Sequence, residues 1–236
     1  MAWAKTKAGG LDAWEIDELQ QLPIQWWKRI AEWLDMIEKG GKWHDAHLQG
    51  YLAFIGKAQG DGPMDQRPLT ILTITYRVWA GTRLTEASEW IAKWIHPRCA
   101  ATEGKTAEDI WANLAQKIEC NIERGCPHGG FSVDLKKCFD MVPILVACDF
   151  LEALGMDPEL VEGLRDFYNI MWRRIRQGQA LGDIMKSVSS LVQGGPRAML
   201  MLNAMFTIFF DVLGHGFADD ANAEAEADEN IEEGTT

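Results

Sequence analysis

The sequence lacks any long, uninterrupted apolar run. The apolar stretch 198–213 is shorter than the ~18 residues needed to cross a membrane, and Asn203 and Asp211 interrupt it. No signal peptide is recognisable, and no internal repeat is visible. We therefore expect no membrane partner and no repeat architecture.

Cysteine is scarce, with five residues at positions 99, 120, 126, 138 and 148. An odd number in a chain of this length, without a signal peptide, predicts free thiols in a reducing, intracellular compartment. Cys120, Cys126 and His128 are close in sequence, but their C-x5-C-x-H spacing does not match a zinc site. Nothing in the sequence chooses between a nuclear and a cytoplasmic location.

Positive charge is missing from the end of the chain. No Lys or Arg occurs from Asp219 to Thr236, whereas the same segment holds eight acids. Removing these eight charges from the formal net charge of −12 leaves −4 for residues 1–218. The composition of residues 221–236 predicts a disordered acidic tail. The mildly acidic remainder argues weakly against nucleic-acid binding but allows a local basic groove.

The rest of the composition is that of a globular protein, with 47% hydrophobic and 25% charged residues. The length allows one large domain or two small ones. Apolar periodicity and capping residues predict helices at 14–38, 82–96, 106–122, 143–155 and 158–171. Residues 172–178 and 184–191 alternate as a hairpin does, with Gly182 and Asp183 near its turn. We therefore expect an α+β fold with a small antiparallel sheet.

Carboxylates stand at unusual positions in two places. In the stretch FSVDLKKCFDMV (131–142), Asp134 ends an apolar segment that reads as a buried strand. A charge there is costly unless an arginine, a helix N-terminus or a metal ion meets it. Asp219 and Asp220 follow Phe217 and Ala218, and a hairpin at this point would bring three carboxylates together. Mg²⁺ prefers such oxygen ligands, and a pair of ions suits phosphoryl transfer.

Simpler interpretations of these carboxylates remain open. Asp134 could cap a loop or pair with Lys136 or Lys137. Asp219 and Asp220 could be the first residues of the acidic tail.

Four short blocks follow one another along the chain. They are Arg67-Pro68-Leu69 with Tyr76-Arg77 beyond, Asp134 to Asp140 (DLKKCFD), Gln193-Gly194-Gly195-Pro196 followed by Asn203, and Phe217 to Asp220 (FADD). In this order they resemble the reverse transcriptase (RNA-directed DNA polymerase) domain of non-LTR retroelements and group II introns. The matching parts of that family are a fingers segment, the first palm motif, the QG loop and the aromatic-x-Asp-Asp motif. The resemblance covers residues from about 50 to 220.

The resemblance implies a set of residue roles. Asp134, Asp219 and Asp220 would be the catalytic acids, with Asp134 and Asp219 as ligands of Mg²⁺ or Mn²⁺. Phe139 would be the steric gate that excludes a 2′-hydroxyl. Arg67 and Lys57 would meet the incoming triphosphate, and Gln193 and Gly194 would line the nucleotide and template pocket. The implied partners are an RNA template, a DNA primer and deoxynucleoside triphosphates. The implied reaction is nucleotidyl transfer to the primer 3′-hydroxyl.

The resemblance also implies a domain plan. Residues 1–60 would form an N-terminal helical segment, 61–130 a fingers-like region, and 131–220 a palm-like region before the tail at 221–236. In that family the chain continues past the Asp pair into the rest of the palm and a thumb, whereas 16 residues follow Asp220 here. We therefore expect an incomplete palm without a thumb, in a fragment of a retroelement protein.

Two alternative functions remain at this stage. The chain could be a non-catalytic remnant that binds nucleic acid or protein, or an RNA-dependent RNA polymerase palm, for which Asp140 supplies a D-x5-D pattern. The run Trp172-Arg173-Arg174-Ile175-Arg176 fits either a nucleic-acid contact or a solvated hairpin face.

Overall fold

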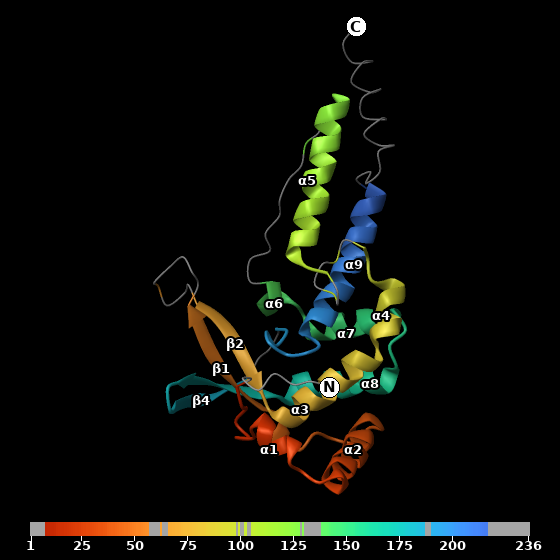
Figure 1. The fold of residues 1–236 in the computed structure, drawn as a ribbon. Coiled ribbons are helices and arrows are strands. Elements are labelled where there is room, and N and C mark those ends of the chain that lie inside the picture. The colour runs from red at the N-terminus through yellow and green to blue at the C-terminus, as the bar shows by residue number, and fades with distance from the viewer. Residues whose placement is uncertain are drawn as a thin grey trace. The chain divides into compact units, whose positions relative to one another are not determined.

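The fold of this protein is α+β in the computed structural model (Figure 1). The structure describes residues 8–56, 62, 66–97, 99, 102, 105–127, 129, 138–186 and 190–216. The chain divides into two compact units. Unit 1 is formed by Met1–Trp90 with Leu135–Leu202, and unit 2 by Ile91–Asp134 with Asn203–Thr236.

A four-stranded sheet belongs to unit 1. Its strands are β1 (Gln49–Gly56), β2 (Gln66–Leu72), β3 (Trp172–Gln177) and β4 (Ala180–Lys186), in the spatial order β2-β1-β3-β4. The pairs β1–β2 and β3–β4 are antiparallel, but β1 and β3 run parallel. The expected antiparallel sheet is therefore wrong for the central pair, and the sheet is mixed. The reason is the long, helix-containing connection between β1 and β3, which is the kind of crossover that parallel pairing requires.

The predicted hairpin is confirmed as β3 and β4, but its turn was predicted too late in the chain. The turn lies at Gly178, whose φ of +59° suits a glycine, while Gly182 lies inside β4. The hairpin carries four basic side chains and one acidic side chain over residues 172–186. It is therefore a cationic element of a chain that is acidic as a whole.

The helices that lie wholly within unit 1 precede β1 in the chain or lie between β2 and β3. They are α1 (Ile16–Gln20), α2 (Ile24–Glu38), the 3-10 turn η1 (Asp45–His47), α3 (Ile74–Glu86), α6 (Cys138–Met141), α7 (Ile144–Ala153) and α8 (Pro158–Ile170). The starts predicted at Pro143 and Pro158 are confirmed for α7 and α8. The single helix predicted at 14–38 is wrong, because Pro23 caps α2 and separates it from α1. This break follows from the preference of proline for the start of a helix.

Aromatic side chains fill the space between α2, α3 and α8. The rings of Tyr76 and Phe167 stack with centroids 3.7 Å apart, and Trp43 packs edge-on against Trp79 at 5.1 Å. All four side chains are buried. The indole of Trp43 also donates a hydrogen bond of 3.2 Å to the backbone carbonyl of Gly163. The core of unit 1 is therefore held by large rings whose polar atoms have partners.

The helix predicted at 82–96 begins earlier than expected and is broken. The structure has α3 from Ile74, followed by α4 (Ser88–Trp94), with Ala87 between them. The N-cap residue of α3 is Thr73, and the backbone amide of Ile74 donates to the carboxylate of Asp12 at 2.8 Å. A distant carboxylate thus caps α3, which no local pattern could predict.

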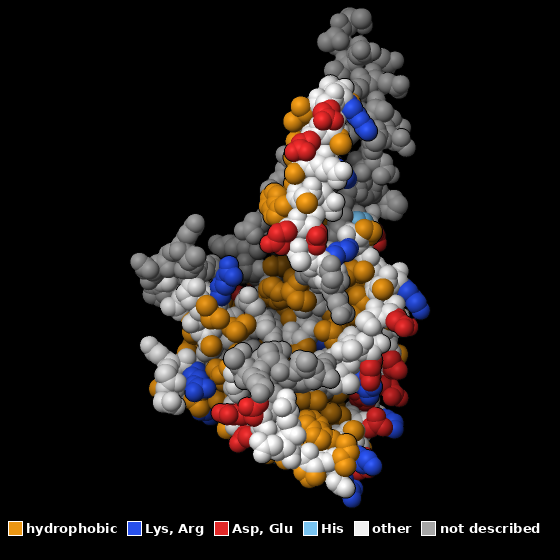
Figure 2. All heavy atoms as spheres, viewed as in Figure 1, with side chains coloured by type: hydrophobic (Ala, Val, Ile, Leu, Met, Phe, Trp, Pro, Cys, Tyr) orange, Lys and Arg blue, Asp and Glu red, His pale blue; other side chains and the backbone are white. Residues whose placement is uncertain are grey.

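The helices of unit 2 are the end of α4, α5 (Ala107–Arg124) and the later part of α9 (Ala198–Gly216). The predicted N-cap Thr106 is confirmed, because its side chain and that of Asp109 form a reciprocal capping box. The predicted apolar face of α5 is exposed: Ile110, Leu114, Ile118 and Ile122 are each at least 39% accessible. Figure 2 shows hydrophobic side chains beside acidic ones along this helix. Among the described residues, no helix is long and apolar enough to span a membrane.

Candidate functional site

The candidate site of unit 1 is built around Arg173 on the central strand β3. Its side chain is half-buried and donates two hydrogen bonds, one to the hydroxyl of Thr70 at 3.3 Å and one to the hydroxyl of Ser190 at 3.1 Å. Thr70 lies on β2, and Ser190 is the first residue of the loop that leads to α9. Arg173 therefore joins the sheet to this loop.

The environment of Arg173 shifts its pKa but not its charge. Burial lowers the pKa of Arg173, and the negative charge of Asp140 acts in the opposite direction. Because an arginine titrates far above neutral pH, the guanidinium stays protonated. Asp140 lies on the short helix α6. Its negative charge therefore acts on Arg173 from a segment that is distant in sequence.

The loop formed by residues 190–197 crosses the edge of β2. The backbone amide of Thr70 donates to the carbonyl of Gln193 at 2.9 Å, and Gly195 N donates to the carbonyl of Val192 at 2.8 Å. Between them, Gly194 has a φ of +99°. A Cβ at Gly194 would lie 2.7 Å from Cδ1 of Leu69. A glycine is thus required at position 194, both because φ is positive there and because the backbone lies close to β2.

The same loop is tied to α6 and to α8. The backbone amide of Leu191 donates to the carbonyl of Phe139 at 2.8 Å. The backbone of Val192 makes a hydrogen bond to the side chain of Tyr168, and burial raises the pKa of Tyr168 to about 12. The Phe139 side chain is itself half-buried. The loop therefore has anchors on β2, α6 and α8, which fix its backbone.

The opposite face of β3 carries cations over aromatic rings. The guanidinium of Arg174 lies 5.5 Å from the ring centroid of Trp172, and that of Arg176 lies 4.9 Å from the ring of Tyr51. Lys186 stands directly opposite Trp172 in the neighbouring strand and is exposed. This face therefore presents positive charge, while the aromatic rings are covered by the arginines.

The predicted site residues are only partly within the described residues. Asp134, Asp219, Asp220 and Lys57 lie outside them. Arg67 is exposed on β2, opposite Ile55 of β1. The described residues 8–56, 66–97, 105–127, 138–186 and 190–216, with the isolated positions between them, contain no group of three or more His, Cys, Asp or Glu side chains suited to a metal ion.

The backbone carbonyls of Phe139 and Gln193 each accept a hydrogen bond, from Leu191 and Thr70 respectively, and Gly194 follows Gln193 in the same loop. The sequence alone did not identify Arg173 as the centre of a site. The basic run at 172–176 was interpreted as a whole, without separating Arg173 from the other arginines. The alternation of a strand offered a signal, because Arg173 and Ile175 face one side and Arg174 and Arg176 the other. The alternation could not indicate which face of β3 the loop at 190–197 would cover.

Comparison with known proteins adds no family assignment: the sequence matches no protein-family model, and no curated protein matches it.

Proposed function

We propose that this chain is a fingers-and-palm module of the reverse-transcriptase type, which transfers nucleotides to a primer 3′-hydroxyl under the direction of an RNA template. The observation that supports this proposal is the convergence of three of the four resembling blocks. Thr70, next to the block at 67–69, bonds to Gln193, and Leu191 bonds to Phe139. Segments more than fifty residues apart in sequence are thereby joined at one place, as a shared nucleotide pocket would require.

The reaction is a displacement at phosphorus. The primer 3′-hydroxyl oxygen forms a bond to the α-phosphate of a deoxynucleoside triphosphate, the bond to the β-phosphate breaks, and pyrophosphate leaves with the electron pair. Asp134 and Asp219 would hold Mg²⁺ or Mn²⁺, with Asp220 beside them as the third catalytic acid, because carboxylates are the donors that hard cations prefer. The bound metal supplies electrostatic stabilisation of the phosphoryl oxygens.

The described residues supply binding and selection in this proposal. Arg67 is exposed on β2, and its planar guanidinium suits a triphosphate. Gln193 is held by its backbone to β2, which leaves its amide side chain for a base or sugar. Phe139 would exclude a 2′-hydroxyl by contact with the sugar.

Primer extension by the full chain tests the proposal. The assay measures incorporation of deoxynucleotides on an RNA template with Mg²⁺ or Mn²⁺. We expect Asp134→Asn to reduce the rate by about a hundredfold or more. Asp183→Asn makes the same chemical change on exposed β4 and should leave the rate unchanged. The proposal is wrong if the wild-type chain binds the primer–template and incorporates no nucleotide with either metal.

A second candidate function is nucleic-acid binding without polymerisation. The basic face of β3, with Arg174 and Arg176 above aromatic rings, favours it because guanidinium groups contact phosphates without needing a metal. Binding that survives Asp134→Asn and removal of divalent metal, in a chain with no extension activity, would support this function instead.

A further inference from the structure

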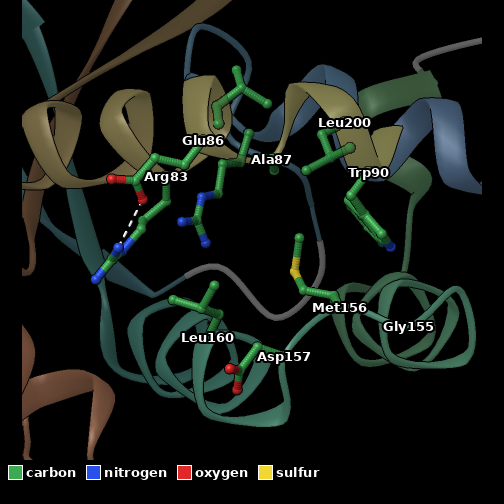
Figure 3. Close-up of a pocket in the computed structure, with 11 residues that line it drawn as sticks. Arg83, Glu86, Ala87, Trp90, Gly155, Met156, Asp157, Leu160 and Leu200 are labelled. Carbon is green, nitrogen blue, oxygen red and sulfur yellow. Dashed lines mark hydrogen bonds and ion pairs between the residues drawn. The ribbon is translucent and has the colours of Figure 1, made fainter. Parts of the chain in front are cut away.

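A cavity of about 300 Å³ lies within unit 1, between helices α3 and α4 on one side and the α7–α8 turn on the other. Figure 3 shows Glu86 and Ala87 on the α3 side, Gly155, Asp157 and Leu160 on the opposite side, and Trp90 and Met156 between them. Arg197 and Leu200, at the start of α9, also line the cavity. Of the residues with a proposed role in polymerisation, the structure describes Arg67, Phe139, Gln193 and Gly194, and none of these four lines the cavity.

Arg197 is the unusual member of this lining. Its side chain is 1% exposed, yet Nε and Nη1 have no hydrogen-bond partner within the part of the chain that the structure describes. Its guanidinium carbon lies 4.2 Å from the ring centroid of Trp79, so one face of the group rests on an aromatic ring. A buried guanidinium with unpaired N–H groups is unfavourable, because each buried donor has lost its water without gaining an acceptor.

The buried carboxylate of Glu38, which acts electrostatically on Arg197, is already engaged by other donors. Glu38 is 8% exposed and accepts hydrogen bonds from the indole of Trp79 at 2.6 Å and from Nε of Arg83 at 2.7 Å. Nη2 of Arg83 makes a further close contact with the same carboxylate. Glu38 favours the charged form of Arg197 electrostatically, but no hydrogen bond joins the two among the described residues.

Glu38 does not line the cavity, and the two acids that do, Glu86 and Asp157, are also engaged and are exposed. Glu86 pairs with Nη1 of Arg83 at 2.7 Å, and Asp157 accepts from the backbone amide of Glu159 at the start of α8. Among the described residues, the buried Arg197 therefore shares the electrostatic support of Glu38 with Arg83, whose side chain is 30% exposed. A ligand in the cavity that Arg197 lines would supply the acceptor that its guanidinium lacks.

The start of α9 adds to this attraction. Arg197 directly precedes the first helical residue, Ala198, and Leu200 in the first turn lines the cavity. Backbone amides in the first turn of a helix have no partner within the helix, and this end of the helix carries partial positive charge. Both features favour a negative group beside Arg197.

We propose that this cavity binds a small carboxylate with a flat, apolar body. The carboxylate pairs with the guanidinium fork of Arg197. Trp90, Met156, Leu160 and Leu200 surround the apolar body. The volume is at the lower end of the range for ligand pockets and fits a molecule of one or two rings. Glu86 and Asp157 disfavour a ligand of higher negative charge, such as a phosphate. The proposal does not depend on the polymerase function.

Titration of the full chain with benzoate tests this site, with benzamide as its uncharged counterpart of the same shape. The readout is the nitrogen–proton resonance of Arg197 Nε, assigned by its loss in Arg197→Lys. We expect benzoate to move this resonance and to bind at least about tenfold more tightly than benzamide, because only benzoate offers a charge-assisted pair.

Two variants locate the binding. Leu160→Trp fills the cavity and keeps Arg197, and Arg197→Lys keeps the charge but removes the planar fork. Each should raise the dissociation constant for benzoate by about tenfold or more. Leu181→Trp, on exposed β4, is the matched control and should leave it unchanged. The proposal is overturned if benzoate binds no better than benzamide, if the Nε resonance does not move at millimolar benzoate, or if a folded Leu160→Trp chain retains full affinity.

Discussion

The backbone amide of Leu191 donates a hydrogen bond of 2.8 Å to the carbonyl of Phe139, and this bond joins two segments that are remote in sequence. It uses only backbone atoms, so the Phe139 side chain can be changed without removing it. Together with the bond from Thr70 to Gln193, it fixes the loop over the sheet edge. The position of this loop is therefore separable, by mutation, from the chemistry proposed for its neighbours.

Phe139→Ala tests the steric-gate role directly. If the chain polymerises, removal of the ring should raise the use of ribonucleotides relative to deoxynucleotides by about tenfold or more, since one apolar contact discriminates on that scale. The measurement is the ratio of incorporation rates in primer extension. An active variant with an unchanged ratio would show that Phe139 does not contact the sugar.

Gly194→Ala should destabilise the loop. The added Cβ is strained at a φ of +99° and meets Leu69 at 2.7 Å, so we expect a loss of more than about 1–2 kcal/mol in the free energy of unfolding. Gly178→Ala is the control, because its φ is +59° but a Cβ there meets no atom within 4 Å. Urea unfolding should rank Gly194→Ala as the more damaging change. Equal losses would mean that the contact with Leu69 contributes nothing.

The basic face of β3 should govern the salt dependence of nucleic-acid binding. Arg174→Gln together with Arg176→Gln removes two cations from this face. The slope of log affinity against log salt should become shallower by about 0.7 for each phosphate of a single strand that the protein no longer neutralises. Lys28→Gln changes an exposed cation on α2 and is the control. An unchanged slope in the double variant would place the phosphate-binding residues elsewhere.

Glu38→Gln should destabilise unit 1 strongly. The substitution leaves Arg83 without its buried carboxylate and Arg197 without its electrostatic support, and we expect a loss of about 3 kcal/mol in the free energy of unfolding. Glu86→Gln removes an exposed partner of the same arginine and should cost less than about 1 kcal/mol.

Adding Arg197→Met to Glu38→Gln tests the coupling between the two residues. This double variant should recover part of the loss, because it removes the buried cation that Glu38 supports. Recovery in urea unfolding would show that Glu38 and Arg197 are coupled, whereas strictly additive losses would contradict this account.

His47 should make stability depend on pH. Burial lowers its pKa from 6.5, and the neighbouring His44 lowers it further, while Asp12 acts in the opposite direction. The folded state therefore prefers neutral His47, so its contribution is complete above pH 6.5 and is lost as the pH falls through and below that value. Burial raises the pKa of Asp12 from 3.8, so protonation of Asp12 favours the folded state. This effect acts as the pH falls towards 3.8, below the range in which His47 titrates.

The measurement is the urea concentration at the midpoint of unfolding, at several pH values between neutral and about pH 5. This range includes the pH at which an unperturbed histidine titrates. His47→Gln should flatten the decline in this window. His44→Gln should give an intermediate slope, because it removes one of the two effects that lower the pKa of His47. A decline of unchanged steepness in His47→Gln would assign the pH dependence to another group.

Local signals were enough to predict several elements from the sequence. The capping box at Thr106 and the prolines at 143 and 158 act through their own backbone neighbours, and the helices begin where these residues indicate. The alternation after Trp172 likewise predicted a hairpin. Pro23 carried an equally local signal, a helix start, and its omission explains why α1 and α2 were predicted as one helix.

The arrangement of charges and strands depended on contacts between distant segments. The amino-acid pattern predicted an α+β fold, the starts of α5, α7 and α8, and the cationic hairpin, because these depend on periodicity, capping and composition within a few residues. The parallel pairing of β1 with β3, the two hydrogen bonds of Arg173 and the burial of Arg197 were decided only by tertiary structure. Whether an arginine is solvated, paired or buried without an acceptor depends on which remote elements surround it, and no local pattern carries that information.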